Sequence, residues 1–62
     1  MDLINNYIIE HYDLLNKLFD KQILNYINSN AFLNIKKKYQ INNDRYYALF
    51  MIFYTYYITN KN

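Results

Sequence analysis

Apolar and polar positions recur with a helical period over residues 3–19. At 100° per residue, one face of this segment is apolar and the opposite face is polar, which predicts an amphipathic helix. Asp2 lies near the expected start, where a carboxylate can cap free N–H groups. The apolar face consists of Ile4, Tyr7, Ile8, Tyr12, Leu14, Leu15, Leu18 and Phe19.

The apolar stripe loses its phase near Asp20. A helix continued without interruption would place Leu24 and Ile27 on the polar side. Asp20 is also a residue type that caps helices well. We therefore expect a break or sharp bend there, followed by a short helix over residues 21–28, although one helix over residues 3–28 is an alternative.

A polar turn at residues 28–30 precedes the next expected helix, residues 31–39. Ser29 or Asn30 would cap this helix. One side of it buries apolar residues, and its last turn carries Lys36, Lys37 and Lys38, where positive charge suits the helix C-terminus.

A second polar turn at residues 42–44 precedes the uncharged segment 46–59, and Asp44 is the expected cap of a final helix. Tyr, Phe and Ile also favour strands. A helix is the better interpretation, because no other segment alternates with period two and could pair with a strand.

This final helix would be largely apolar around its whole circumference. One face is aromatic and the other is smaller and flatter, which suggests the protein core as one neighbour and a partner helix as the other. We expect a single all-α domain, residues 1–62, built as a bundle of three to four helices, with its last helix at a homodimer interface.

Composition supports the expectation of association. A chain of 62 residues buries a modest share of its surface, and without Cys it cannot form disulfides. The net charge of +2 is well below that of a dedicated nucleic-acid binder. The N-terminal residues do not form a signal peptide, so we expect a cytoplasmic protein.

The residue types present argue against catalysis. Ser29 is the single serine and His11 the single histidine, so few residues could supply a nucleophile and the base that activates it. His11 is expected at the edge of the core, held by a Tyr hydroxyl or a backbone carbonyl. Without Gly there is no phosphate-binding loop. We expect neither an enzyme nor a cofactor or metal site.

Nucleic-acid binding is one alternative function. Lys36, Lys37 and Lys38 stand beside Tyr39, with Arg45 not far along the chain, and such groups can contact phosphates and stack on bases. A solvated helix end is the commoner role of a lysine run. The fit to a helix-turn-helix motif is poor.

Membrane association is a second alternative, as in small hydrophobic peptides and toxins. Residues 46–58 would form a helix of about 20 Å, whereas a bilayer core of about 30 Å needs about 20 residues. The segment is therefore too short to span comfortably, and we expect no membrane role.

The preferred interpretation is a protein-binding module that acts by steric occlusion. Nine Tyr are more than so small a core can hide, and Tyr47, Tyr54 and Tyr56 are expected to contact a partner. Lys36 to Lys38 and Arg45 would steer the module toward an acidic or nucleoprotein target. In size and style the chain resembles the accessory inhibitors of phages and mobile elements, of which the anti-CRISPR proteins are the best known.

Overall fold

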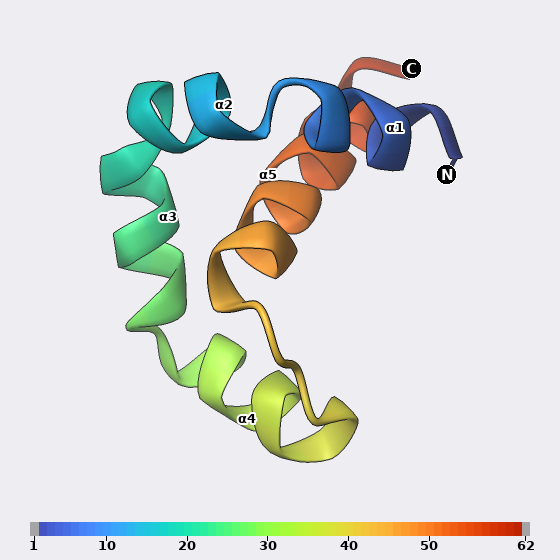
Figure 1. Ribbon diagram of the computed structural model, residues 1–62. Helices are drawn as coiled ribbons and strands as arrows, with labels where there is room; N and C mark the ends of the chain where they lie inside the picture. Colours follow the sequence, from blue (N-terminus) through green and yellow to red (C-terminus); the bar gives the residue numbers. More distant parts are fainter. Residues whose placement is uncertain (1, 62) are drawn as a thin grey trace.

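A computed structural model of the protein describes residues 2–61, with the side chains of residues 3–60. All regular structure in this part of the chain is helical, which confirms the expected all-α class (Figure 1). The expectation of three to four helices was too low for these residues. The five helices are α1 (Asp2–Glu10), α2 (Tyr12–Leu18), α3 (Asp20–Ile27), α4 (Asn30–Tyr39) and α5 (Asp44–Lys61).

The additional helix arises from a bend at His11, which divides the expected helix 3–19 into α1 and α2. His11 has φ −118° and ψ 24°, and Phe19 adopts nearly the same conformation at the junction of α2 and α3. Backbone hydrogen bonds continue across both bends, from Leu15 N–H to His11 O and from Ile23 N–H to Phe19 O, each 2.9 Å. The chain therefore turns at little cost in hydrogen bonding. The break predicted near Asp20 is confirmed.

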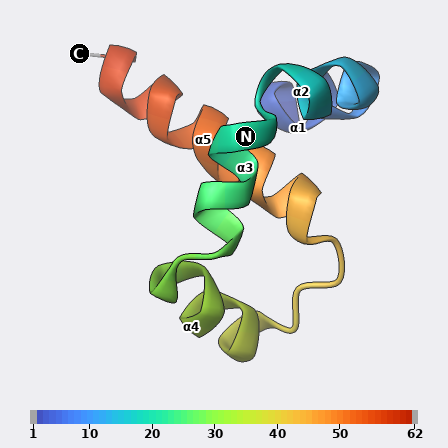
Figure 2. The ribbon, with the colours of Figure 1, turned by 90° about the vertical axis from the view of Figure 1, so that its left-hand side faces the viewer.

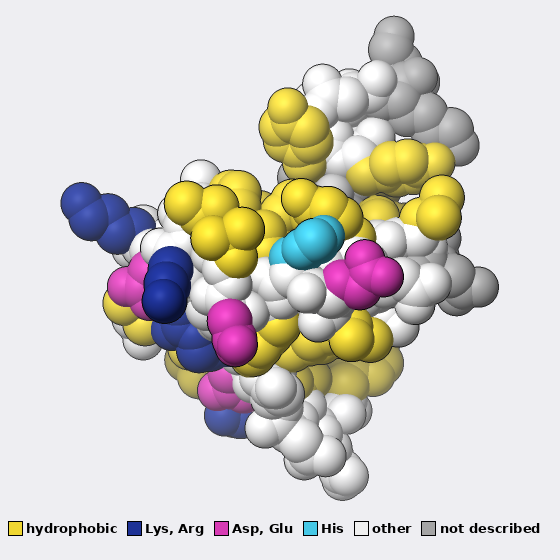
Figure 3. Space-filling model, turned by 45° about the horizontal axis from the view of Figure 1, so that its top comes forward, with side chains coloured by type: hydrophobic (Ala, Val, Ile, Leu, Met, Phe, Trp, Pro, Cys, Tyr) yellow, Lys and Arg dark blue, Asp and Glu magenta, His cyan; other side chains and the backbone are white. Residues whose placement is uncertain are grey.

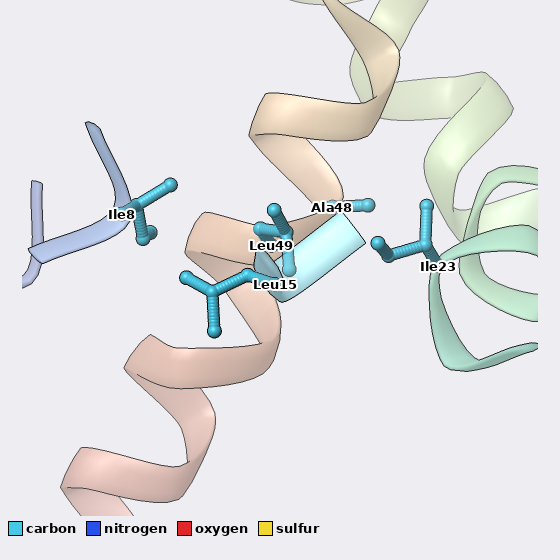
Figure 4. Packing of buried hydrophobic residues seen from close by; sticks show 5 residues of the cluster. All are labelled: Ile8, Leu15, Ile23, Ala48 and Leu49. Atoms are coloured by element: carbon cyan, nitrogen blue, oxygen red, sulfur yellow. The ribbon is translucent and has the colours of Figure 1, made fainter. Parts of the chain in front are cut away.

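Helix α5 is the central element, and α1, α2 and α3 pack around it (Figures 1 and 2). Side chains from these four helices converge on one point (Figure 4). Each of them is at most 3% exposed, and burial of one large aliphatic side chain contributes about 1.5–3 kcal/mol. The cluster consists of Ile8, Leu15, Ile23, Ala48 and Leu49.

Helix α4 is joined to the rest of the molecule through Phe32, which is 1% exposed. Its ring centroid lies 5.3 Å from that of Tyr26 on α3 and 6.0 Å from that of Tyr47 on α5. Ser29 caps α4, since its Oγ accepts a hydrogen bond of 3.2 Å from Phe32 N–H. This expected cap is confirmed.

Two other expected caps were wrong. Asn43 caps α5, because its Oδ1 accepts a 3.0 Å hydrogen bond from Tyr46 N–H, while Asp44 is already helical. Asp20 lies inside the first turn of α3, where it forms an ion pair with Arg45. Both carboxylates still lie in the favourable first turn of a helix dipole. The side chain of Asp2, the third expected cap, lies outside the described residues.

The burial of side chains in α5 decreases along the helix toward its C-terminal end and depends less on which face of the helix they occupy. Ala48 and Leu49 lie on the two faces that the sequence distinguished, and both are fully buried within the chain. Residues 55–60 are exposed, and the final turns extend beyond the other helices (Figure 2). The radius of gyration is 11.6 Å, against about 10.6 Å for a compact chain of this length. The expected division into a core face and a partner face was therefore wrong for the first half of α5.

Candidate functional site

Helix α1 and the second half of α5 enclose a groove of about 470 Å³, which we call the α1/α5 groove. Figure 3 views this end of the molecule, where hydrophobic side chains gather near the single histidine, His11. The groove is lined by Leu3, Ile4, Tyr7, Phe53, Tyr56, Tyr57 and Asn60.

The floor of the groove is a fixed aromatic cluster around Phe53. The ring of Phe53 meets Tyr7 edge-on at 5.9 Å and Phe19 edge-on at 5.3 Å between centroids. Such pairs add about 0.5–1.5 kcal/mol beyond the burial of their area. Because Phe53 contacts both α1 and the junction of α2 and α3, it holds the groove in a defined shape.

The walls of the groove are apolar and open to solvent. The exposed fraction is 85% for Leu3, 70% for Tyr56, 53% for Tyr57 and 49% for Tyr7. The amide of Asn60 turns toward the α5 backbone, since its Nδ2 donates a 3.0 Å hydrogen bond to Tyr56 O. The surface therefore offers mainly apolar contact area.

His11, which the sequence placed at the edge of the core, is an exposed residue beside the groove residue Tyr7. Its ring packs edge-on against Tyr7, with 4.6 Å between centroids, and its Nε2 is 3.9 Å from Glu10 Oε2. The His11 side chain is 43% exposed. An aromatic ring and a carboxylate thus surround it, instead of the Tyr hydroxyl or backbone carbonyl that we expected.

The three tyrosines predicted to bind a partner do not lie together. Tyr56 lines the groove, whereas the half-buried Tyr54 stacks on Phe50 at 6.0 Å between centroids. Tyr47 is half-buried near α4, against Phe32. Burial, and to a smaller extent neighbouring Tyr47, raise the pKa of Tyr26 above its ordinary value of 10.0. Tyr47 is therefore part of the packing between α3, α4 and α5.

Two of the predicted basic residues form ion pairs inside the chain. Lys36 Nζ lies 2.9 Å from Asp44 Oδ2, and Arg45 Nη2 lies 2.7 Å from Asp20 Oδ1. Lys37 and Lys38 are exposed at the end of α4, and Lys38 Nζ is 5.4 Å from the ring centroid of Tyr39. The basic surface is thus narrower than the sequence suggested.

Sequence reasoning missed Leu3, Tyr7, Phe53 and Tyr57 as groove residues, and it assigned Tyr7 to the core. The available signal was an excess of large apolar residues over what so short a chain can bury. That signal does not say which residues stay exposed, because exposure here depends on where α1 crosses α5.

Over residues 2–61 no helix combines the length and apolarity needed to cross a bilayer. In the same part of the chain, His, Asp and Glu side chains form no group of three that could hold a metal ion. No protein-family model, curated protein or solved structure matches this chain.

Proposed function

We propose that this chain is a non-enzymatic protein-binding module that acts in the cytoplasm, as an accessory regulator or inhibitor of the kind carried by phages and mobile elements. It would work by steric occlusion, with the α1/α5 groove as its main binding surface. The observation that supports this proposal is the exposure of large apolar side chains around a groove whose floor is fixed by packing.

The size of this apolar surface is the first argument. Leu3, Tyr7, Tyr56 and Tyr57 together expose on the order of 500 Å². The largest apolar patch on a typical monomer is about 300–600 Å² and is often functional, and here it belongs to a chain with a total accessible surface of only 5004 Å². The patch is therefore large in proportion to the molecule.

The residue types are the second argument. Tyr56 and Tyr57 carry large, rigid rings that lose little conformational entropy on binding, and tyrosine is enriched where proteins bind one another. An apolar groove of this kind suits the apolar face of a helix with anchors at positions i, i+3 or i+4, and i+7. A target that inserts such a ridge would have that surface blocked to its other partners.

The test is capture of a target from lysates of the source cells on the immobilised protein. We compare wild type with Tyr56→Ser and with Tyr39→Ser, a matched change at a residue that is 62% exposed on α4, outside the groove. Wild type and Tyr39→Ser should capture the same target, and Tyr56→Ser should retain less than about a tenth of it, as at an interface hot spot.

The amounts captured are measured by quantitative mass spectrometry. Equal capture by the three proteins, or a loss confined to Tyr39→Ser, would contradict the assignment of the groove. Circular dichroism must show equal helicity in the variants, which is expected because both side chains are largely exposed.

Nucleic-acid binding is a second candidate function. The observation that favours it is the exposure of Lys37, Lys38 and Tyr39 at the end of α4, with Lys38 Nζ 5.4 Å from the ring centroid of Tyr39. This arrangement offers two ammonium groups for phosphates and one ring for base stacking.

A further inference from the structure

We infer that the α1/α5 groove binds a second copy of this chain, so that the protein is a homodimer with its two-fold axis at this surface. The inference rests on the proposed function of the groove and names its first partner, which a target that enters the groove would displace. It also adds to the sequence-based expectation, which placed the last helix at the interface, because α1 supplies one wall of the groove.

The available area fits a dimer. A standard interface buries about 800 Å² per partner, which is about a sixth of the 5004 Å² that this chain exposes. The four exposed wall residues supply on the order of 500 Å² of it. Asn60, a polar residue that lines the groove from α5, lies at the edge of this surface. The rim can then be polar, as in most interfaces.

The surface contains both a hollow and a projection, as a two-fold interface requires. Leu3 projects at the rim with 85% exposure, and the hollow beside it has Phe53 as its floor. In an isologous dimer the same patch of both copies forms the interface. If a residue of the first copy contacts a given residue of the second, the same two residues also meet with the copies exchanged. Leu3 of each copy can therefore enter the groove of its partner.

The distribution of charge permits this pairing. None of the residues that line the groove is charged, so contact between two copies buries no ion there. Each copy has a net charge of +2, but Lys37 and Lys38 lie on α4, at the end of the molecule opposite to the groove (Figure 1). Repulsion between the Lys37 and Lys38 side chains of the two copies is therefore weak at this surface.

The size of the chain gives the dimer a physical advantage. A 62-residue domain has a small core, and disulfides cannot assist it because the chain has no Cys. Residues 55–60 of α5 are exposed in the single chain. A second copy would cover the side of these turns that lines the groove and stabilise the folded state through mass action.

The test is the mass in solution, measured by sedimentation equilibrium between about 1 μM and about 1 mM. Wild type should reach twice the chain mass of 7.7 kDa. Tyr56→Lys should weaken the dimer by about 30-fold or more, as at a hot spot. Leu33→Lys, on an α4 residue that is 49% exposed, adds the same charge away from the groove and should change the Kd by less than about threefold.

Disulfide cross-linking keeps the test decisive even if a lysine variant folds poorly. Because the chain lacks Cys, single substitutions report contacts cleanly. A mixture of Leu3→Cys and Tyr56→Cys should form linked dimers about ten times faster than Leu33→Cys under the same oxidising conditions, since bridged Cα atoms must approach within about 7 Å.

A wild-type protein that stays monomeric over the whole concentration range would overturn the homodimer. So would a dimer that Leu33→Lys dissociates and Tyr56→Lys does not. A monomer that co-sediments with vesicles of phosphatidylcholine and phosphatidylglycerol would also overturn it and assign the groove to a membrane surface.

The two proposals fail in different ways. A monomer whose target capture is still lost in Tyr56→Ser would overturn the homodimer and leave the binding module in place. If the dimer depends on the groove but Tyr56→Ser captures as much target as wild type, the homodimer stands. Target binding through the groove would then be overturned.

Discussion

At the scale of single residues, helix ends depend on which side chain occupies one position. Gln40 ends α4 in the left-handed conformation, with φ 52° and ψ 56°, and its N–H bonds to Lys36 O at 3.0 Å. Glycine is the usual residue at such a site, because any Cβ costs about 1 kcal/mol there. The chain contains no Gly, so the position could not be identified from the sequence.

Replacing Gln40 with Gly should raise the free energy of unfolding by about 1 kcal/mol, because it removes the strain of the left-handed residue. Urea unfolding followed by circular dichroism measures the change. Gln22→Gly, within α3, is the matched control and should lower the free energy by about 1 kcal/mol, because its backbone is helical. Equal effects of the two substitutions would contradict the interpretation of Gln40.

At the scale of helices, the connection between α5 and the junction of α2 and α3 depends on Arg45. Its Nε donates to Asn16 Oδ1 at 2.5 Å, and its Nη2 donates to Asn16 O at 3.2 Å and to Asp20 Oδ1 at 2.7 Å. Asn16 Nδ2 also donates to Tyr12 O at 2.9 Å. Arg45 thereby fixes the bend of the chain around α5, and its predicted role in steering a partner stays a prediction.

Replacing Arg45 with Ala should lower the free energy of unfolding by about 1–2 kcal/mol, since it removes charge-assisted hydrogen bonds that are only partly exposed to solvent. Lys37→Ala, which removes an exposed cation from the end of α4, should change it by less than about 0.5 kcal/mol. Thermal or urea unfolding compares the two variants. Similar small losses would show that the bend does not depend on Arg45.

At the scale of the whole molecule, the two candidate binding surfaces lie at opposite ends. The apolar groove is formed by α1 and the end of α5, and the exposed lysines lie on α4 (Figure 1). The first surface is suited to apolar partners, and the second to phosphates. Substitutions at one end can therefore test that binding surface without altering the binding surface at the other end.

The nucleic-acid candidate predicts that wild type binds a short mixed-sequence DNA or RNA with an affinity that falls steeply as salt rises. Lys37→Glu combined with Lys38→Glu should abolish this binding, measured by fluorescence anisotropy. Lys17→Glu combined with Lys21→Glu makes the same change in net charge, from +2 to −2, on α2 and α3. Equal losses in the two variants, or no binding by wild type, would contradict a specific lysine site.

The sequence by itself determined the helical class, the break near Asp20 and the turn before α4, and it narrowed the cap of α4 to Ser29 or Asn30. These features depend on the period of apolar residues or on hydrogen bonds between residues about four positions apart, so local reasoning reaches them. The choice between Asn43 and Asp44 as a cap was local too, but both residue types cap well, and the sequence alone could not separate them.

Tertiary structure decided the rest. The ion pair of Arg45 joins residues 25 positions apart, and its hydrogen bonds to Asn16 join residues 29 apart. The bend at His11 keeps its local hydrogen bonds, so nothing in the local pattern marks it, and it is favoured because it brings α1 and α2 onto α5. The same crossing of α1 over α5 leaves Leu3 and Tyr56 exposed, because a chain this short has no further helix to cover them.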